Sequence, residues 1–459
     1  MTNGSDVADV GLLSPQWAGT PVAAATSDAA IVAAMLDVEV ALAYAWQELG
    51  FAPDGTGALI ARVVDSLDID VASLAARSRS GGNPIIPLVK DLRAAVAAED
   101  AAAAVWVHRG ATSQDIHDSA LMLVAQRALV AARSDLASVV DSLSSLADSH
   151  RATLMVSRTL TQHGVPSTFG LKAAGWLAGV AHASVALDRA VAELPLQWGG
   201  AGGTLASYSV IGETGTGLAV SDAVADRLGL ARSIPWQTQR SAVVQLASAL
   251  AQVGGALGKI AVDVLVMVRP EFGELGEPSA AGRGGSSAMP QKQNPVLSVL
   301  IHSAARQAPG LAAEVQRSAL AVDERPDGAW HAEWQAIREL LRLVGGAAGL
   351  AAELTSGLSV FPTAMLRNLG MSGSLVVSER LMLEYGPLVG RDRLQELVTA
   401  QAVDPTVDLG ALLRAEPSLA NVSDQSLADS LDPAQYVGDN DLIIDRAIES
   451  ARSALRKEQ

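Results

Sequence analysis

Two long runs of apolar residues at heptad spacing constrain the fold of this chain more than any other feature. The first run lies within residues 114–147 and consists of Met122, Ala125, Leu129, Ala132, Leu136, Val139, Leu143 and Leu146. The second run consists of Val243, Leu246, Leu250, Val253, Leu257, Ile260, Val264 and Met267. With a rise of roughly 1.5 Å per residue, each helix approaches or exceeds about 40 Å. Such lengths favour a long helical bundle over an ordinary two-layer helical domain.

Other segments also show helical spacing. Ser27 to Leu49 has apolar residues at steps of three and four, with Ser27 placed to cap its start and Gly50 to end it. Further helices are expected at 87–99, 169–194, 295–319 and 330–358. The composition becomes more mixed after Phe361-Pro362. The sequence therefore predicts an all-α fold with an N-terminal helical domain (1–111), a central long-helix bundle (112–362) and a C-terminal helical domain (363–459).

Composition excludes several classes of protein. The 459 residues are 49% hydrophobic but only 3% aromatic, which suits a large core of closely packed helices. A formal net charge of -16 disfavours binding to nucleic acid or to an anionic membrane surface. The absence of cysteine excludes disulfides, thiol catalysis and Cys-ligated metals.

The sequence also gives no sign of export or membrane insertion. The first 17 residues contain Asp6 and Asp9 and lack the apolar core of a secretory signal. The most apolar run, 256–268, is interrupted by Lys259 and Asp263 and is short for a membrane span. We therefore expect a cytoplasmic protein with no membrane partner.

The strongest chemical signal is the loop at 285–295, which reads Gly-Ser-Ser-Ala-Met-Pro-Gln-Lys-Gln-Asn-Pro. A serine hydroxyl is a very weak acid and carries a proton only where backbone N–H groups and an ammonium stabilise its alkoxide. Lys292 and Asn294 stand just ahead of a helix expected to begin near Pro295. A flexible Gly/Ser linker is the alternative, but the Met-Pro-x-Lys-x-Asn-Pro continuation is not typical of linkers.

Residues 285–295 resemble the signature loop of the fumarase/aspartase superfamily. Residues 108–115 resemble the first site segment of that superfamily, and residues 157–166 resemble the second. The resemblance implies a homotetramer in which the central bundles pack together and each site takes segments from more than one subunit. Within the superfamily the resemblance is closest to the bacterial 3-carboxy-cis,cis-muconate cycloisomerases, through residues 86–90, 112–115, 235–240, 330–334 and 431–436.

The resemblance also implies roles for individual residues. Ser286 corresponds to the proton-transfer residue, and the expected catalytic set is Ser286, Lys292 and His108. A structural role for His108 before a glycine turn stays open. The residues expected to bind substrate are Arg109, Thr112, Ser113, Gln114, Arg158, Thr159, Gln162, Thr238, Arg240, Ser287, Met289, Asn294 and Arg325. The expected substrate is a small polycarboxylate, 3-carboxy-cis,cis-muconate, which closes to 4-carboxymuconolactone in aromatic catabolism without a metal or other cofactor.

One departure from the superfamily pattern concerns the leaving group. Most lyases of the superfamily have His after the Arg-Thr of the second segment, but here Leu160 follows Arg158-Thr159. That His protonates a poor leaving group, whereas a lactone opens by expelling a carboxylate, whose conjugate acid has a pKa of about 4. Such a leaving group needs no general acid, which favours a cycloisomerase over adenylosuccinate lyase. Takeover of the missing role by nearby His163 stays open.

Two smaller departures bear on the substrate. Gln237 stands where the cycloisomerases often have His, and Gln293 replaces a frequent Arg in the loop. Both changes affect polar or cationic groups near the expected site, so they bear on the identity of the substrate rather than on the reaction type. The alternatives are another superfamily lyase, such as a fumarate-releasing adenylosuccinate lyase, or a helical protein that has lost its activity. Intact Ser286, Lys292 and Asn294 argue against the latter.

Overall fold

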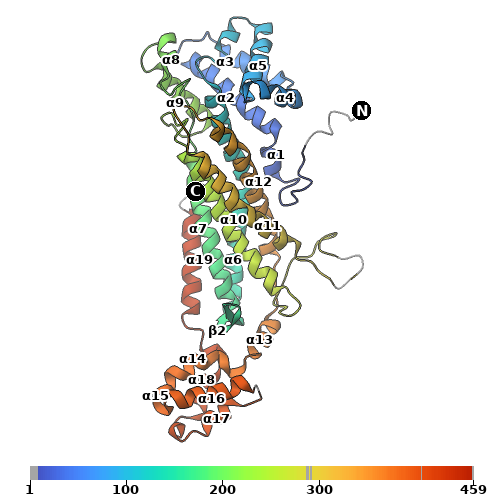
Figure 1. Ribbon diagram of the computed structural model, residues 1–459, viewed down its shortest axis with the longest axis vertical. Coiled ribbons are helices and arrows are strands. Elements are labelled where there is room, and N and C mark those ends of the chain that lie inside the picture. The colour runs from blue at the N-terminus through green and yellow to red at the C-terminus, as the bar shows by residue number, and fades with distance from the viewer. Residues whose placement is uncertain (1–8, 286–288, 290–291, 405, 457–459) are drawn as a thin grey trace. The chain divides into compact units, whose positions relative to one another are not determined.

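The computed structural model describes residues 9–285, 289, 292–404 and 406–456. These residues form an all-α fold to which two small antiparallel sheets, each of two strands, are added (Figure 1). The predicted fold class is therefore confirmed.

Five long helices contain most of the predicted helical segments. They are α6 (Ser113–Ser149), α7 (Phe169–Ala192), α10 (Ser241–Met267), α11 (Val296–Ser318) and α12 (Gly328–Ser356). The first heptad run lies on α6 and the second on α10, and every position of both runs is buried except Leu146, which is half-buried. Burial of these runs accounts for the length of both helices, because apolar residues at heptad spacing keep one stripe of a helix against its neighbours.

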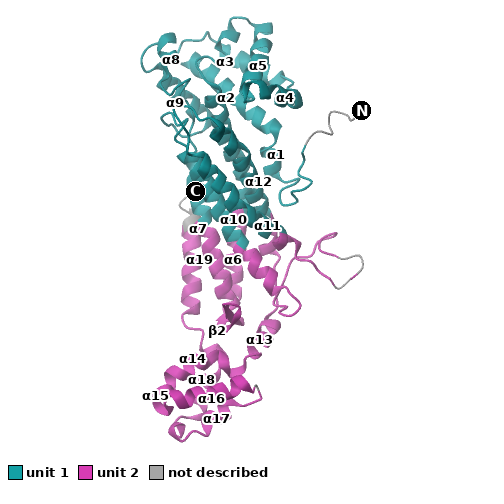
Figure 2. Ribbon diagram, viewed as in Figure 1, with its two compact units in different colours: residues 1–135, 183–258, 300–349 teal, residues 136–182, 259–299, 350–459 magenta. Residues whose placement is uncertain are grey.

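One compact unit comprises Met1–Asp135, Ala183–Gly258 and Leu300–Gly349 (Figure 2). Its shorter elements are α1 (Pro21–Ala25), α2 (Asp28–Glu48), α3 (Thr56–Ser66), α4 (Val71–Gly81), α5 (Ile85–Glu99), η2 (Ala103–Trp106), α8 (Ala206–Ile211) and α9 (Thr216–Leu228). Helix α2 begins as predicted, because the Ser27 side chain accepts a hydrogen bond from the Ala30 N–H at 3.1 Å. Gly50 follows its end with a φ of 77°, a conformation that favours glycine.

The second unit comprises Leu136–His182, Lys259–Val299 and Leu350–Gln459. Strands β1 (Leu154–Thr159) and β2 (Gln162–Thr168) form a hairpin, and β3 (Leu275–Gly276) pairs with β4 (Ser359–Val360). The remaining elements are α13 (Pro362–Gly370), η3 (Gly373–Val377), α14 (Ser378–Glu384), α15 (Gly386–Val389), α16 (Arg391–Val403), α17 (Leu409–Arg414), η4 (Pro417–Leu419), α18 (Asp424–Leu431), η5 (Pro433–Gln435) and α19 (Asn440–Arg456).

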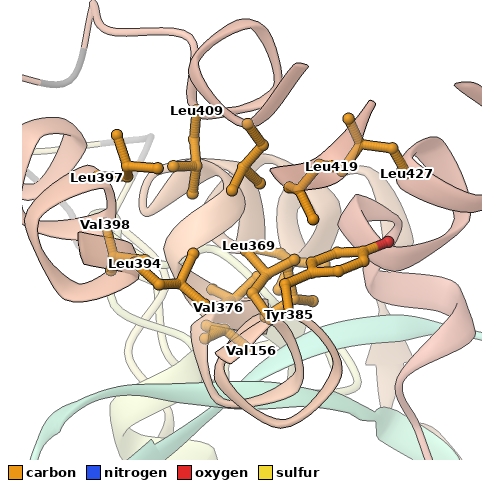
Figure 3. Packing of buried hydrophobic residues seen from close by; sticks show 13 residues of the cluster. Val156, Leu369, Val376, Tyr385, Leu394, Leu397, Val398, Leu409, Leu419 and Leu427 are labelled. Carbon is orange, nitrogen blue, oxygen red and sulfur yellow. The ribbon is translucent and has the colours of Figure 1, made fainter. Parts of the chain in front are cut away.

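A cluster of 13 buried apolar residues holds the short C-terminal helices together (Figure 3). Most members come from residues 369–427, but Val156 of β1 belongs to the same cluster and is fully buried. Burying one such side chain stabilises a fold by roughly 1.5–3 kcal/mol. The cluster therefore fixes the β1–β2 hairpin, which carries the second predicted site segment, to the C-terminal helices.

The limits of the two compact units fall inside α6, α7, α10, α11 and α12. The division into three segments at 111 and 362 stays a prediction. Helices α2 and α10 are long and apolar enough to cross a membrane by length and composition alone. Their most apolar windows are 61% and 50% buried within the protein, and core helices of soluble proteins pass the same test.

Candidate active site

The first site segment begins at His108, whose side chain is fixed by a buried carboxylate of α2. The His108 backbone N–H donates to Oε2 of Glu39 at 2.9 Å, and the ring Nδ1 lies 2.6 Å from Oε1. Only 1% of the Glu39 side chain is exposed. His108 has a φ of 57°, which is uncommon for a residue other than glycine and is found at functional sites. Glu39 stabilises this conformation by binding both the backbone and the ring.

The same contact changes the charge of the imidazole. Burial alone would lower the pKa of His108, but the charge and hydrogen bond of Glu39 outweigh it, so the pKa is raised. Because Nδ1 is bound to Glu39, a proton exchanged with a substrate would pass through Nε2. Glu39 was not predicted as a site residue. Its only signal in the sequence is a carboxylate between the apolar residues Val38 and Val40 of an apolar helix.

The turn after His108 depends on glycine and on aromatic packing. Gly110 has a φ of 84°, and a Cβ added there would lie 2.8 Å from the Tyr208 ring. The Trp46 indole N–H donates to the Arg109 carbonyl at 3.1 Å. The Arg109 guanidinium lies 5.2 Å from the centroid of the Trp106 ring. These contacts hold the backbone that leads from His108 into α6.

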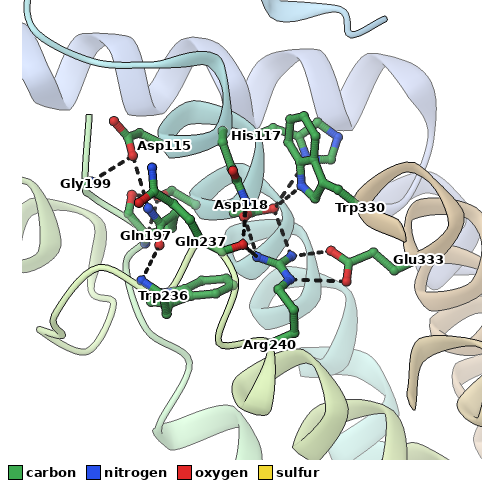
Figure 4. Close-up of polar contacts among 12 residues, drawn as sticks. Asp115, His117, Asp118, Gln197, Gly199, Trp236, Gln237, Arg240, Trp330 and Glu333 are labelled. Carbon is green, nitrogen blue, oxygen red and sulfur yellow. Dashed lines mark hydrogen bonds and ion pairs between the residues drawn. The ribbon is translucent and has the colours of Figure 1, made fainter. Parts of the chain in front are cut away.

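Asp115 ties the start of α6 to a glycine-rich loop. Its carboxylate accepts hydrogen bonds from the backbone N–H groups of Thr112 (3.0 Å), Gly199 (2.8 Å) and Gly200 (3.0 Å), and from Nε2 of Gln197 (3.1 Å) (Figure 4). Burial raises its pKa to about 6, although the four donors act in the opposite direction. Asp115 thus positions the predicted site residue Thr112.

Three predicted substrate-binding residues come together at this point. Arg325 donates from Nη1 to the Thr112 hydroxyl at 3.0 Å and from Nη2 to the Ser113 hydroxyl at 2.9 Å. A hydroxyl that accepts from arginine keeps its own proton for donation. Thr112 and Ser113 are therefore oriented as hydrogen-bond donors, as a carboxylate ligand requires.

Two other predicted substrate ligands lie in a buried polar cluster (Figure 4). Arg240 is only 1% exposed at its side chain and forms ion pairs with Asp118, at 2.6 Å, and with Glu333. Gln114 is fully buried and donates to Asp118 at 3.1 Å and to the Gln237 carbonyl at 2.9 Å. The hydrogen bonds and ion pairs described for Arg240 and Gln114 are made with other residues of the protein. Their contact with substrate stays a prediction, as it does for half-buried Thr238 in the same loop.

The buried charges of this cluster act strongly on one another. Burial favours the neutral form of each carboxyl, but the Arg240 charge lowers the pKa of Asp118 well below its usual range. For Glu333 burial prevails and raises the pKa to about 7, with Arg240 opposing it. Asp118 is therefore the carboxylate that stays ionised against the arginine, whereas burial favours the protonated form of Glu333. The cluster holds α6, the 235–240 loop and α12 together through Asp118, Arg240 and Glu333.

The second site segment is the β1–β2 hairpin of the other unit. Arg158 makes a bidentate ion pair with fully buried Glu274, at 3.0 and 2.7 Å, and 17% of its side chain is exposed. Asn368 donates to the same carboxylate at 2.8 Å. The predicted ligands Thr159 and Gln162 face each other across the end of the hairpin, and both are exposed. Glu274, which the sequence did not reveal, fixes Arg158 in place.

The tip of this hairpin has an unusual sequence. Leu160 and Thr161 form the turn with φ values of 48° and 70°, and Leu160 is 96% exposed. Two-residue turns of this kind favour Asn and Gly, because positive φ is unfavourable for a residue with a large side chain. His163, the alternative proton carrier, lies two residues farther on, with its Nδ1 2.8 Å from the Ser372 hydroxyl.

The third segment is only partly described. Ser286 and Ser287 lie outside the described residues. Met289, Lys292 and Asn294 are exposed, and Asn294 donates its backbone N–H to the Gly284 carbonyl at 2.9 Å.

Gly285 pairs with Gln293, so the two ends of the loop lie together. Helix α11 starts directly after the loop, as predicted. Its first N–H groups donate to the carboxylate of Glu277, with Leu297 at 3.0 Å and Ser298 at 2.8 Å.

Comparison with known proteins covers nearly the whole chain. Residues 18–310 match a family described as "Lyase". The nitrosuccinate lyase of Streptomyces davaonensis is 47% identical over 96% of this chain and 95% of its own length. The 3-carboxy-cis,cis-muconate cycloisomerase of Pseudomonas aeruginosa is 40% identical over 97% of each chain.

The crystal structure of the 3-carboxy-cis,cis-muconate lactonizing enzyme from Pseudomonas putida matches the fold with a TM-score of 0.86 and 35% sequence identity. The match covers 94% of this chain and 96% of that one.

Proposed function

This chain belongs to the fumarase/aspartase superfamily of lyases, and we propose that it catalyses the closure of 3-carboxy-cis,cis-muconate to 4-carboxymuconolactone. It would act as an intramolecular lyase, that is, a cycloisomerase. The substrate would be a small polycarboxylate, and neither a metal nor an organic cofactor would take part.

Leu160 carries the part of this proposal that concerns the leaving group. It occupies the tip of the β1–β2 hairpin, where most lyases of the superfamily have a proton-donating histidine, and it has no titratable group. An amine or purine leaving group would have to be protonated as it departs, whereas a carboxylate of pKa about 4 leaves as the anion. The chain therefore suits a reaction in which the group added or expelled is a weakly basic oxyanion.

In the lactonising direction one proton transfer is required. A substrate carboxylate oxygen bonds to one end of the conjugated double bond, and the electron pair moves to the carbon next to another carboxylate. Ser286 would protonate that carbon and recover its proton from solvent. Lys292 and Asn294 would stabilise the enolate-like dianion that precedes this step. Thr112 and Ser113, oriented by Arg325, would hold a substrate carboxylate.

A second candidate is the elimination of nitrite from nitrosuccinate to give fumarate. It is favoured by the 47% identity to the Streptomyces nitrosuccinate lyase. Nitrite is also a weakly basic leaving group, so Leu160 fits this reaction equally well. Gln293, which replaces a frequent arginine, leaves one cation fewer near the loop, as a substrate with two carboxylates rather than three would need. Here Ser286 would remove the proton, and the C–N bond would break.

One assay panel on the full-length protein separates these reactions. Lactonisation is followed by loss of the diene absorbance of 3-carboxymuconate, and nitrosuccinate elimination by the release of both nitrite and fumarate. Adenylosuccinate, whose amine leaving group needs an acid, is the third substrate. Ser286→Ala is the matched control for each reaction.

We expect turnover of 3-carboxymuconate that Ser286→Ala lowers by roughly 10²–10⁴-fold. Turnover of nitrosuccinate alone would replace the first candidate by the second and keep the reasoning from Leu160. Efficient turnover of adenylosuccinate, or of none of the three compounds, would overturn the proposal.

We further propose that the active form is a cytoplasmic homotetramer. The superfamily resemblance supports this assembly. The separation of the site segments also supports it, because none of the segments at 108–115, 157–166 and 284–295 contains all the groups that the reaction requires. Val262 of helix α10 is an apolar side chain that is 42% exposed, and a neighbouring subunit would cover it.

A further inference from the structure

A cavity of about 630 Å³ opens beside the first site segment, within one compact unit. One wall is a single face of α5, formed by Ile86, Lys90, Arg93 and Ala97 at steps of four, three and four. The opposite wall is formed by residues 108 and 111–113 at the start of α6. A volume of this size is typical of small-molecule sites.

The lining residues with a fixed charge, Lys90 and Arg93, are both cationic. Lys90 and Arg93 are exposed, and His108 has a raised pKa. The two carboxylates of α5 lie outside the lining and are already paired, Asp91 with Arg77 at 2.6 Å and Glu99 with Arg62 at 2.7 Å.

The helix therefore presents its cations to the cavity and its anions elsewhere. In a chain of net charge -16, such a local concentration of positive charge attracts an anion.

The two cationic side chains of α5 and the hydroxyls of Thr112 and Ser113 line the same cavity. The described contacts of Lys90 include no ion pair, whereas one N–H of Arg93 donates to the Val107 carbonyl at 3.0 Å. Thr112 and Ser113, which accept from Arg325, also line the cavity. A carboxylate placed here would have an ammonium and a guanidinium on one side and two hydroxyl donors on the other.

We propose that Lys90 and Arg93 form a subsite for one carboxylate of the substrate. The subsite proposal rests on the proposed function in one respect, namely that the ligand is the substrate of that reaction. Neither residue is among the site residues expected from the superfamily motifs, although Lys90 ends the 86–90 segment that carries part of the resemblance. The subsite would determine specificity, because the number of carboxylates that the enzyme accepts depends on the cations available to pair with them.

The test uses citrate, a tricarboxylate that the proposed reaction does not consume. Its binding to the full-length protein is measured by calorimetry at low ionic strength. Lys90→Met and Lys90→Gln remove the charge, and Lys90→Arg keeps it. Arg79→Met, at an exposed residue of α4 that does not line the cavity, is the matched control. Arg93 is left unchanged because it also binds the Val107 carbonyl.

We expect loss of the Lys90 charge to weaken citrate binding about tenfold, the effect of losing one partly exposed charge-assisted hydrogen bond. Lys90→Arg should stay within about twofold of the unaltered protein, and Arg79→Met should have no effect. With the active substrate, Lys90→Met should raise KM by a similar factor and leave kcat within about twofold.

Unchanged citrate affinity in both charge-removing variants, or an equal loss in Arg79→Met, would overturn the subsite. If none of the substrates is turned over while citrate binding still depends on Lys90, the proposed function fails and the anion subsite stands. If the substrate is turned over with a KM that does not depend on Lys90, the subsite fails and the function stands.

Discussion

Replacing Glu39 by glutamine tests whether the pair with His108 is an ionic one. Glutamine has nearly the same shape as glutamate, so its amide can still bind the His108 backbone N–H and a neutral imidazole. It cannot stabilise the imidazolium by its charge. The substitution therefore removes the electrostatic part of the contact and leaves the packing of α2 in place.

The sign of the pH effect follows from the raised pKa of His108. A folded-state pKa above the unfolded value of about 6.5 stabilises the protein fully below that value, and the stabilisation is lost as the pH rises through the folded pKa. A charge-assisted hydrogen bond contributes roughly 1.5–3 kcal/mol, and we take about 2 kcal/mol because 17% of the His108 side chain is exposed. Glu39→Gln should thus destabilise the protein by about 2 kcal/mol at pH 6 and by less than about 1 kcal/mol at pH 9.

Urea unfolding followed by tryptophan fluorescence, at one fixed protein concentration, measures this difference. The matched control is Glu48→Gln on the same helix, where the glutamate is 47% exposed and pairs with Arg227 at the surface. That change should alter stability by at most about 1 kcal/mol. A loss for Glu39→Gln that is constant from pH 6 to pH 9, or that grows with pH, would refute the ionic pair.

Three further predictions concern the reaction and the assembly. Ser286→Ala should lower kcat by roughly 10²–10⁴-fold with little change in substrate binding, and His163→Ala should lower it far less in steady-state kinetics. The reverse order would remove both the proton donor and the reasoning from Leu160. EDTA should leave activity unchanged, and a loss restored by a divalent metal would contradict the role of Lys292. Sedimentation at micromolar concentration should give a tetramer, and a monomer would rule out shared sites.

The long helices could be predicted from sequence because their signal is local and repeated. Each heptad run places apolar residues on one stripe over many turns, and the observed α6 and α10 end within two residues of the predicted segments. The β1–β2 hairpin was not predicted. Its turn, Leu160-Thr161, lacks the Asn or Gly that usually marks a hairpin in sequence. Strand pairing there is supported instead by Val156, which packs into a core formed by residues more than 200 positions later.

The site could be predicted only as far as its motifs extend. The motif at 108–115 gave His108, Thr112 and Ser113, but not Glu39, which lies 69 residues away in sequence from its partner His108. Glu274 is likewise 116 residues from Arg158. Such partners are single carboxylates on other elements, and only the folded chain brings them to the motif. A sequence pattern cannot identify them, because any of the 49 acidic residues could serve.

These buried carboxylates divide the cations of the site into two kinds. Arg158 and Arg240 are held by fully buried acids, so moving either one toward a substrate would leave a buried charge unpaired, at roughly 3–5 kcal/mol. Each arginine therefore stabilises the compact unit to which it belongs, and its contact with substrate stays a prediction. Lys90 is exposed beside the cavity, its described contacts include no ion pair, and it can pair with a ligand without that loss. Lys90 would thus recognise substrate charge, and Arg240, in the same compact unit, would fix α6, whose first residue lines the cavity.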